Sequence, residues 1–207
     1  MSWPGLNRWS ALWRAVGVAD APPQWYERLT TAYAEPHRHY HNQRHIAECL
    51  AEFDRARHLA VHPAAVELAL WFHDAVYKPR AGDNEEQSAA LLKRCAAETA
   101  MPGSLAETVA RLIMATKNHE TGADPDAALM VDIDLSILGQ SEERFSEYEQ
   151  QIRKEYRWVP RPIFASKRAE ILDRFLARPT IFATEWFRAK YERQARRNLQ
   201  ASIANLR

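Results

Sequence analysis

Histidine and aspartate side chains of the kind that bind metals interrupt an apolar stretch of the chain. The segment ALWFHDAVY places His73 directly before Asp74, between Phe72 and Val76. A carboxylate buried among apolar residues costs on the order of several kcal/mol unless it is paired or bound to a cation. A further histidine, His45, lies one segment earlier in RHYHNQRHI. Two imidazoles and an adjacent carboxylate favour a divalent metal site over three unrelated core residues.

A second apolar stretch, LMVDIDLSIL, is interrupted by Asp132 and Asp134. Residues two apart on an α-helix point about 200° away from each other, so only one of the two can face a common site directly. The other is expected to cap the helix or to orient a neighbouring group. Along the chain the ligand order is then His, His-Asp and Asp, on three separate helices. Such a set leaves coordination positions for water and substrate.

Two more histidines are candidates for the site. His41 lies four residues before His45, which is the spacing of a helical zinc pair, but Asn42 stands where a zincin has glutamate, so we exclude that class. His41 is then a candidate for substrate contact, or an exposed histidine at a helix start. His119 ends the segment ATKNH. It is either a functional imidazole or a helix C-terminal histidine favoured by the helix dipole.

Three basic residues lie in or beside the loops that follow these segments. Lys78, Arg80 and Lys117 can bind phosphate oxygens if the site handles a phosphorylated molecule. Each of them taken singly is more typical of an ordinary basic surface residue. We therefore predict them as substrate-binding residues only as a group.

The elements that must position these side chains are predicted to be helices. Apolar residues recur at helical spacing through almost the whole chain, and only 6 glycines are present. We predict an all-α bundle of about ten helices. Asn84 is expected to cap one helix, Ser104 and Glu107 to form a capping box on the next, and Gly139 to close another. The expected helices begin near 6, 22, 41, 63, 84, 104, 126 and 141, with two more after Pro160 and Pro179.

The chain is predicted to form one domain over 1–207, with 1–24 and 180–207 as helical extensions that pack on it. Its 28 basic and 27 acidic residues give a net charge of +1, which makes no global case for a long nucleic acid or an anionic membrane. No apolar run approaches a membrane span, no secretory signal is visible, and 2 cysteines form no disulfide-rich pattern. We therefore expect a cytoplasmic protein.

The same residues resemble a known family. The chain is similar to the HD superfamily of metal-dependent phosphohydrolases, and within it to a bacterial group of predicted metal-dependent HD phosphohydrolases. The resemblance covers roughly 25–200 and includes Arg168 with ILDRFLARPTIF. The other matching stretches are YHNQRHI at 40–46, WFHDAVY at 71–77, DNEEQSA at 83–89, ATKNH at 115–119, DIDLSILG at 132–139, IRKEYRWV at 152–159 and ARRNL at 195–199.

The resemblance implies a role for each matching residue. His45 would be the first metal ligand, His73 and Asp74 the central pair, and an aspartate the last ligand. In the family this aspartate precedes a leucine-rich stretch, which favours Asp134, with Asp132 as the alternative. The resemblance also makes Glu86 a candidate acid. Extra histidines such as His119 hold a second metal in some HD proteins.

The function that we predict is hydrolysis of a nucleotide or another small phosphate ester by a metal-activated water. The metal is a divalent ion, with Mn, Zn, Fe, Co, Ni and Mg as candidates. Asp74 would help to take the proton of the water, and His119 or Glu86 would protonate the leaving oxygen. A dinuclear iron oxygenase of the HD type and a non-catalytic ligand-binding module are the alternatives. The oligomeric state is left open, a dimer included.

Overall fold

The computed structural model describes residues 3–207. Every regular element in this range is helical, with ten α-helices, two short 3-10 turns and no strand, which confirms the predicted all-α fold. The internal contacts divide the chain into two compact units, one up to Ile133 and one over Asp134–Arg207. The single domain over 1–207 stays a prediction, and each unit is described by itself.

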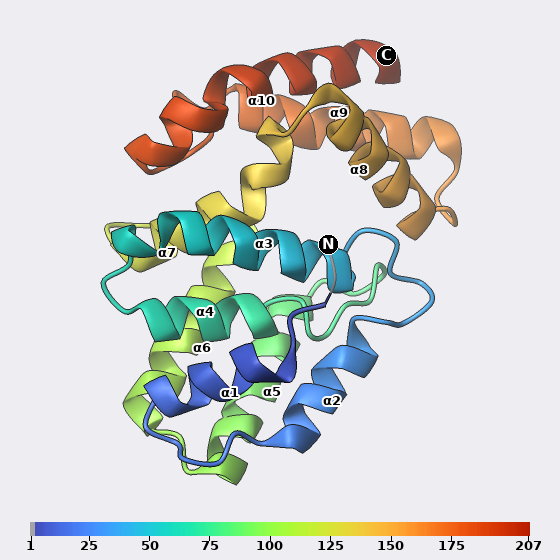
Figure 1. The fold of residues 1–207 in the computed structure, drawn as a ribbon. Helices are drawn as coiled ribbons and strands as arrows, with labels where there is room; N and C mark the ends of the chain where they lie inside the picture. Colours follow the sequence, from blue (N-terminus) through green and yellow to red (C-terminus); the bar gives the residue numbers. More distant parts are fainter. Residues whose placement is uncertain (1–2) are drawn as a thin grey trace. The chain divides into compact units, whose positions relative to one another are not determined.

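The first unit is built around α4, whose eight residues from Ala65 to Phe72 are all buried. A helix that is apolar all round must be covered on every side. Helices α1, α3, α5 and α6 supply that cover (Figure 1). The helices of this unit are α1 (Leu6–Ala15), α2 (Pro23–Ala32), α3 (Gln43–Ala56), α4 (Pro63–Phe72), α5 (Asn84–Thr99), α6 (Gly103–Asn118) and α7 (Pro125–Asp134). Asp134, the last residue of α7, is the first residue of the second unit.

Aromatic rings fix the C-terminal end of α4. The ring centroid of Trp71 lies 5.2 Å from that of Trp9 on α1, and the two rings are arranged edge to face. It also lies 5.2 Å from the ring centroid of Trp3. The ring centroids of Phe72 and of Trp25 on α2 are 6.3 Å apart. Such ring pairs add to the free energy of burial. These ring contacts pack the end of α4, just before His73, against α1 and α2.

The predicted helix starts are partly confirmed. The side chain of Asn42 caps α3 by accepting a hydrogen bond from the Arg44 amide at 2.9 Å. The capping box of Ser104 and Glu107 is wrong, because α6 begins earlier, with Pro102 at its N-cap position. The fixed backbone of that proline favours an early helix start. Glu107 instead forms an ion pair with Lys93.

Two further predicted boundaries are corrected. Asn84 does not cap α5 with its side chain, which is bonded to the backbone of Lys78 through both of its polar atoms. The helix predicted over 126–138 ends at Asp134 and continues as the 3-10 turn Leu135–Gly139. Gly139 does close this turn. A Cβ atom at this position would lie 2.5 Å from Cβ of Tyr191, so only glycine fits without a shift.

The second unit consists of the turn Leu135–Gly139 and three helices, α8 (Glu142–Glu155), α9 (Arg161–Leu176) and α10 (Glu185–Leu206). Helix α10 packs against both α9 and the turn (Figure 1). The buried amide of Asn198 donates to the carbonyl oxygens of Leu138 and Gln140, both at 2.8 Å. These bonds join α10 to the end of the turn. Among residues 3–207, no helix combines the length and the apolar character that crossing a bilayer requires.

Candidate metal centre

The His-Asp pair lies at the end of α4 and not inside a helix. We predicted that His73 and Asp74 lie on a helix that begins near 63, but α4 ends at Phe72 and His73 is its C-cap. The Nδ1 atom of His73 lies 3.0 Å from the carbonyl oxygen of Leu70. A carbonyl can only accept, so Nδ1 carries the proton and Nε2 keeps its lone pair. The chain thus orients one nitrogen of His73 as a metal ligand.

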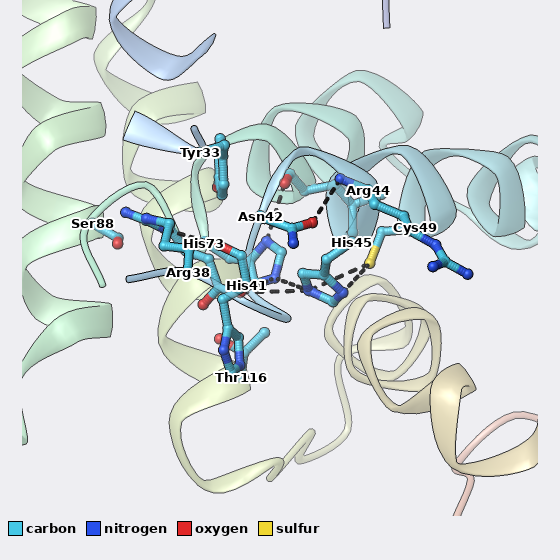
Figure 2. Close-up of polar contacts among 12 residues, drawn as sticks. Tyr33, Arg38, His41, Asn42, Arg44, His45, Cys49, His73, Ser88 and Thr116 are labelled. Carbon is cyan, nitrogen blue, oxygen red and sulfur yellow. Dashed lines mark hydrogen bonds and ion pairs between the residues drawn. The ribbon is translucent and has the colours of Figure 1, made fainter. Parts of the chain in front are cut away.

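The Nε2 atom of His73 lies close to two other atoms that can bind a metal. It lies 3.2 Å from Nε2 of His45, which is on α3 (Figure 2). The same atom lies 3.2 Å from Oδ2 of Asp74. The third side of this triangle, between His45 Nε2 and Asp74 Oδ2, measures 3.4 Å. Three of the five predicted ligands therefore converge on one point.

The size of this triangle fits a bound cation. A metal about 2.0–2.1 Å from each ligand separates neighbouring ligand atoms by about 2.8–3.0 Å in octahedral geometry and by about 3.3–3.4 Å in tetrahedral geometry. The three sides, from 3.2 to 3.4 Å, lie closest to the tetrahedral values. His45 and His73 are buried, whereas the side chain of Asp74 is 15% exposed. The donor set is thus open to solvent beside its carboxylate.

Asp74 is held in the charged form that metal binding requires. Burial raises the pKa of its carboxyl, but the proximity of the imidazoles of His73, His41 and His45 lowers it further. The net result is a pKa well below the usual value. A carboxyl with such a pKa is ionised at neutral pH.

Arg38 is a residue of this site that the sequence did not indicate. Only 5% of it is exposed. Its guanidinium donates to the carbonyl oxygens of Asp74 at 2.6 Å, Ala75 at 3.0 Å and His41 at 3.1 Å (Figure 2). The segment after α4 has lost its helical bonds, and Arg38 replaces them. Nothing in the pattern RHYH distinguishes a buried arginine from an exposed one.

Aromatic side chains complete the setting of Arg38. Its guanidinium lies 5.1 Å from the ring centroid of Tyr33 and 5.6 Å from that of Tyr77. The hydroxyl of Tyr33 donates to the carbonyl oxygen of Trp71 at 3.0 Å. His41 stacks on Tyr77, with centroids 4.1 Å apart. His41 thus lies beside the metal-donor group, as a residue in contact with substrate would.

Cys49 is a second residue that we did not predict for the site. Its Sγ atom lies 3.7 Å from both ring nitrogens of His45 (Figure 2). The two residues are four apart on α3, so their contact follows from helical spacing. That spacing is visible in the sequence.

The remaining predicted site residues are more dispersed. Glu86 on α5 and Lys117 on α6 form an ion pair with each other. Lys78 and Arg80 are exposed in the loop between α4 and α5. His119 is the half-buried C-cap of α6 and has a left-handed backbone with a φ of 53°.

The fourth metal ligand is not decided. Asp132 is fully buried in α7, whereas Asp134 is half-buried and is the last residue of that helix. Their different exposure agrees with the expectation that they point in different directions. Asp134 also falls in the second unit, so only Asp132 shares a unit with His45.

Comparisons with known proteins add no name to this site. No protein-family model, no curated protein and no solved structure matches the chain. The resemblance to the HD superfamily therefore stays a prediction.

Proposed function

We propose that the protein is a metal-dependent phosphohydrolase that acts on a nucleotide or another small phosphate ester. The observation that supports this proposal is the triangle of His45, His73 and Asp74, whose sides match those of a coordinated divalent ion. Structural zinc sites are usually closed and rich in cysteine, whereas this donor set leaves positions for water and substrate. An open set of two imidazoles and a carboxylate is typical of a catalytic ion.

The residues around the triangle have distinct tasks in this proposal. A divalent cation there would supply Lewis acidity and lower the pKa of a water molecule towards neutrality. Asp74, held ionised, can accept the proton of that water. The exposed side chains of Lys78 and Arg80 can offset the charge on phosphate oxygens.

The proton donor for the leaving oxygen is better assigned to His119 than to Glu86. The hydrogen bond from Lys117 lowers the pKa of the Glu86 carboxyl. A carboxylate that is already ionised at neutral pH cannot serve as a general acid. The pair of Glu86 and Lys117 also reduces the charge that Lys117 offers to a phosphate.

A dinuclear iron oxygenase is the second candidate because another imidazole lies near the donors. The ring centroids of His41 and His45 are 5.9 Å apart. A second iron would need further ligands, for which His41 and His119 are the candidates. Anaerobic loading with iron, followed by Mössbauer spectroscopy, separates a coupled iron pair from a single ion.

Release of phosphate tests the proposed hydrolysis directly. We expect at least one nucleotide or sugar phosphate to be hydrolysed with Mn²⁺ or Co²⁺ present and no hydrolysis above background after chelation. The His73→Ala variant is the matched control for contaminating phosphatases, because it should be inactive under all conditions. Turnover that survives in this variant, or a broad substrate screen without any metal-dependent turnover, would contradict the proposal.

A further inference from the structure

A cavity of about 740 Å³ lies in the second unit, among α8, α9 and α10. This volume falls within the range of about 300–1,000 Å³ that is typical of small-molecule sites. All of the cavity's lining residues belong to this one unit. The metal donors His45, His73 and Asp74 are not among them. The cavity is therefore a separate candidate site.

The walls of the cavity are largely apolar and carry two aromatic rings. Phe145 comes from α8 and Phe164 from α9. The guanidinium of Arg153 lies 4.8 Å from the ring centroid of Phe164, which holds that ring in place by a cation–π contact. Leu206, near the end of α10, adds an aliphatic wall. An occupant with an aromatic or aliphatic body would replace water on these surfaces.

Four cationic side chains surround the same cavity, namely those of Arg153, Lys154, Arg161 and Arg197. Within residues 3–207, none of the four forms an ion pair with a carboxylate. Arg153 donates to the carbonyl oxygens of Tyr156 and Val159 at 2.6 and 3.0 Å, and Arg197 donates to the side chain of Gln194. Their positive charge is therefore not neutralised by the protein.

The acids at the cavity do not balance this charge. Glu149 forms an ion pair with Arg168, in which Nε of Arg168 lies 3.1 Å from Oε1 of Glu149. Glu149 also accepts a hydrogen bond from the hydroxyl of Ser202 at 2.9 Å. The remaining acid in the lining is Glu142, at the start of α8. The second unit as a whole has 15 basic and 10 acidic residues, a net +5, while the complete chain has +1. An anion is thus the occupant that this field favours.

We propose that this cavity binds a small organic polyanion with an aromatic body, of the nucleoside phosphate class. The rings of Phe145 and Phe164 receive the base, and the four cations receive the phosphate oxygens. An inorganic anion would leave the apolar walls wet, and a neutral aromatic molecule would leave the cations without a partner. This inference is independent of hydrolysis at the metal centre.

Displacement of a fluorescent probe tests the proposal on the full-length protein in the presence of EDTA. The probe is 1-anilinonaphthalene-8-sulfonate, an aromatic anion whose emission rises in apolar cavities, and ATP is the competitor. We expect ATP to displace it at concentrations about ten-fold or more below those of tripolyphosphate or adenosine. In the double variant Lys154→Gln/Arg161→Gln, displacement by ATP should weaken about ten-fold or more because two charge-assisted contacts are lost.

The control is Lys167→Gln/Arg174→Gln, which removes the same charge at positions outside the cavity lining. It should leave displacement unchanged, and circular dichroism should show native helix content in both double variants. In the His73→Ala variant, ATP should displace the probe as it does in the wild-type protein. Loss of displacement in His73→Ala would assign the nucleotide to the metal centre and overturn the proposal. So would equal displacement by tripolyphosphate and ATP, or equal weakening in the two double variants.

Discussion

Alanine at His73 or at Asp74 is expected to lower the affinity for a divalent metal by more than about 100-fold, a larger loss than is typical of residues that only support a ligand. His73 presents the lone pair of Nε2 to the triangle, and Asp74 supplies its only negative charge. Titration of Mn²⁺ or Zn²⁺ into each metal-free variant measures the effect. Helix content should stay native, because both residues follow the last turn of α4.

His62→Ala is the matched control for this experiment. His62 precedes α4, its side chain is 67% exposed, and it pairs with Asp126 at 2.9 Å instead of facing the triangle. Its loss should leave metal affinity unchanged. Wild-type affinity in either His73→Ala or Asp74→Ala would remove the metal centre from this part of the chain.

The same titration identifies the fourth ligand. Asp134→Ala should lose most of the affinity if Asp134 binds the ion, and Asp132→Ala should then lose only about 10–100-fold through its effect on neighbouring groups. The reverse order would keep the site and assign the ligand to Asp132. Small and equal losses would exclude both aspartates.

Methionine at Arg38 is expected to lower the free energy of unfolding by about 3–5 kcal/mol, the range for losing one partner of a buried charged contact. Methionine fills similar space, so the loss comes from the hydrogen bonds. Three carbonyl oxygens, those of His41, Asp74 and Ala75, would lose their donor. Each buried group without a partner is unfavourable by about 1–3 kcal/mol. Urea unfolding in EDTA measures the change without a contribution from bound metal.

Arg94→Met is the matched control, because it also removes an arginine of the first unit. Arg94 pairs with Glu98 one turn away at the surface of α5, and its side chain is 64% exposed. Exposed pairs of this kind contribute about 0–1 kcal/mol. A loss below about 1 kcal/mol in Arg38→Met would show that water replaces the guanidinium, and Arg38 would not be the residue that positions Asp74.

The sequence predicted those features that depend on local pattern. Apolar periodicity and proline positions predicted the order of the helices, including a helix that begins near 41. The cost of burying charge singled out His73 and Asp74 as candidate metal donors, and the structure brings both of them close to His45. These arguments need only neighbours along the chain.

Features that depend on distant contacts were missed. After α4 ends at Phe72, the carbonyl oxygens of Asp74 and Ala75 accept from Arg38, which precedes them by more than thirty residues. The pairing of Glu86 with Lys117 joins two helices and changes the role that each can have. The basic character of the second unit was also hidden, because the net charge of the whole chain averages it with an acidic first part.

Two helix ends differ in what can be engineered at them. Ala100, after α5, and His119, after α6, both have left-handed backbones, with φ values of 54° and 53°. Side chains other than that of glycine raise the energy of this conformation by about 1 kcal/mol. Ala100 is exposed and has no role in the proposed reaction. Glycine at this position should therefore raise thermal stability without lowering the proposed activity. Glycine at His119 would also relieve the backbone strain, but it would remove the imidazole that the proposed reaction uses.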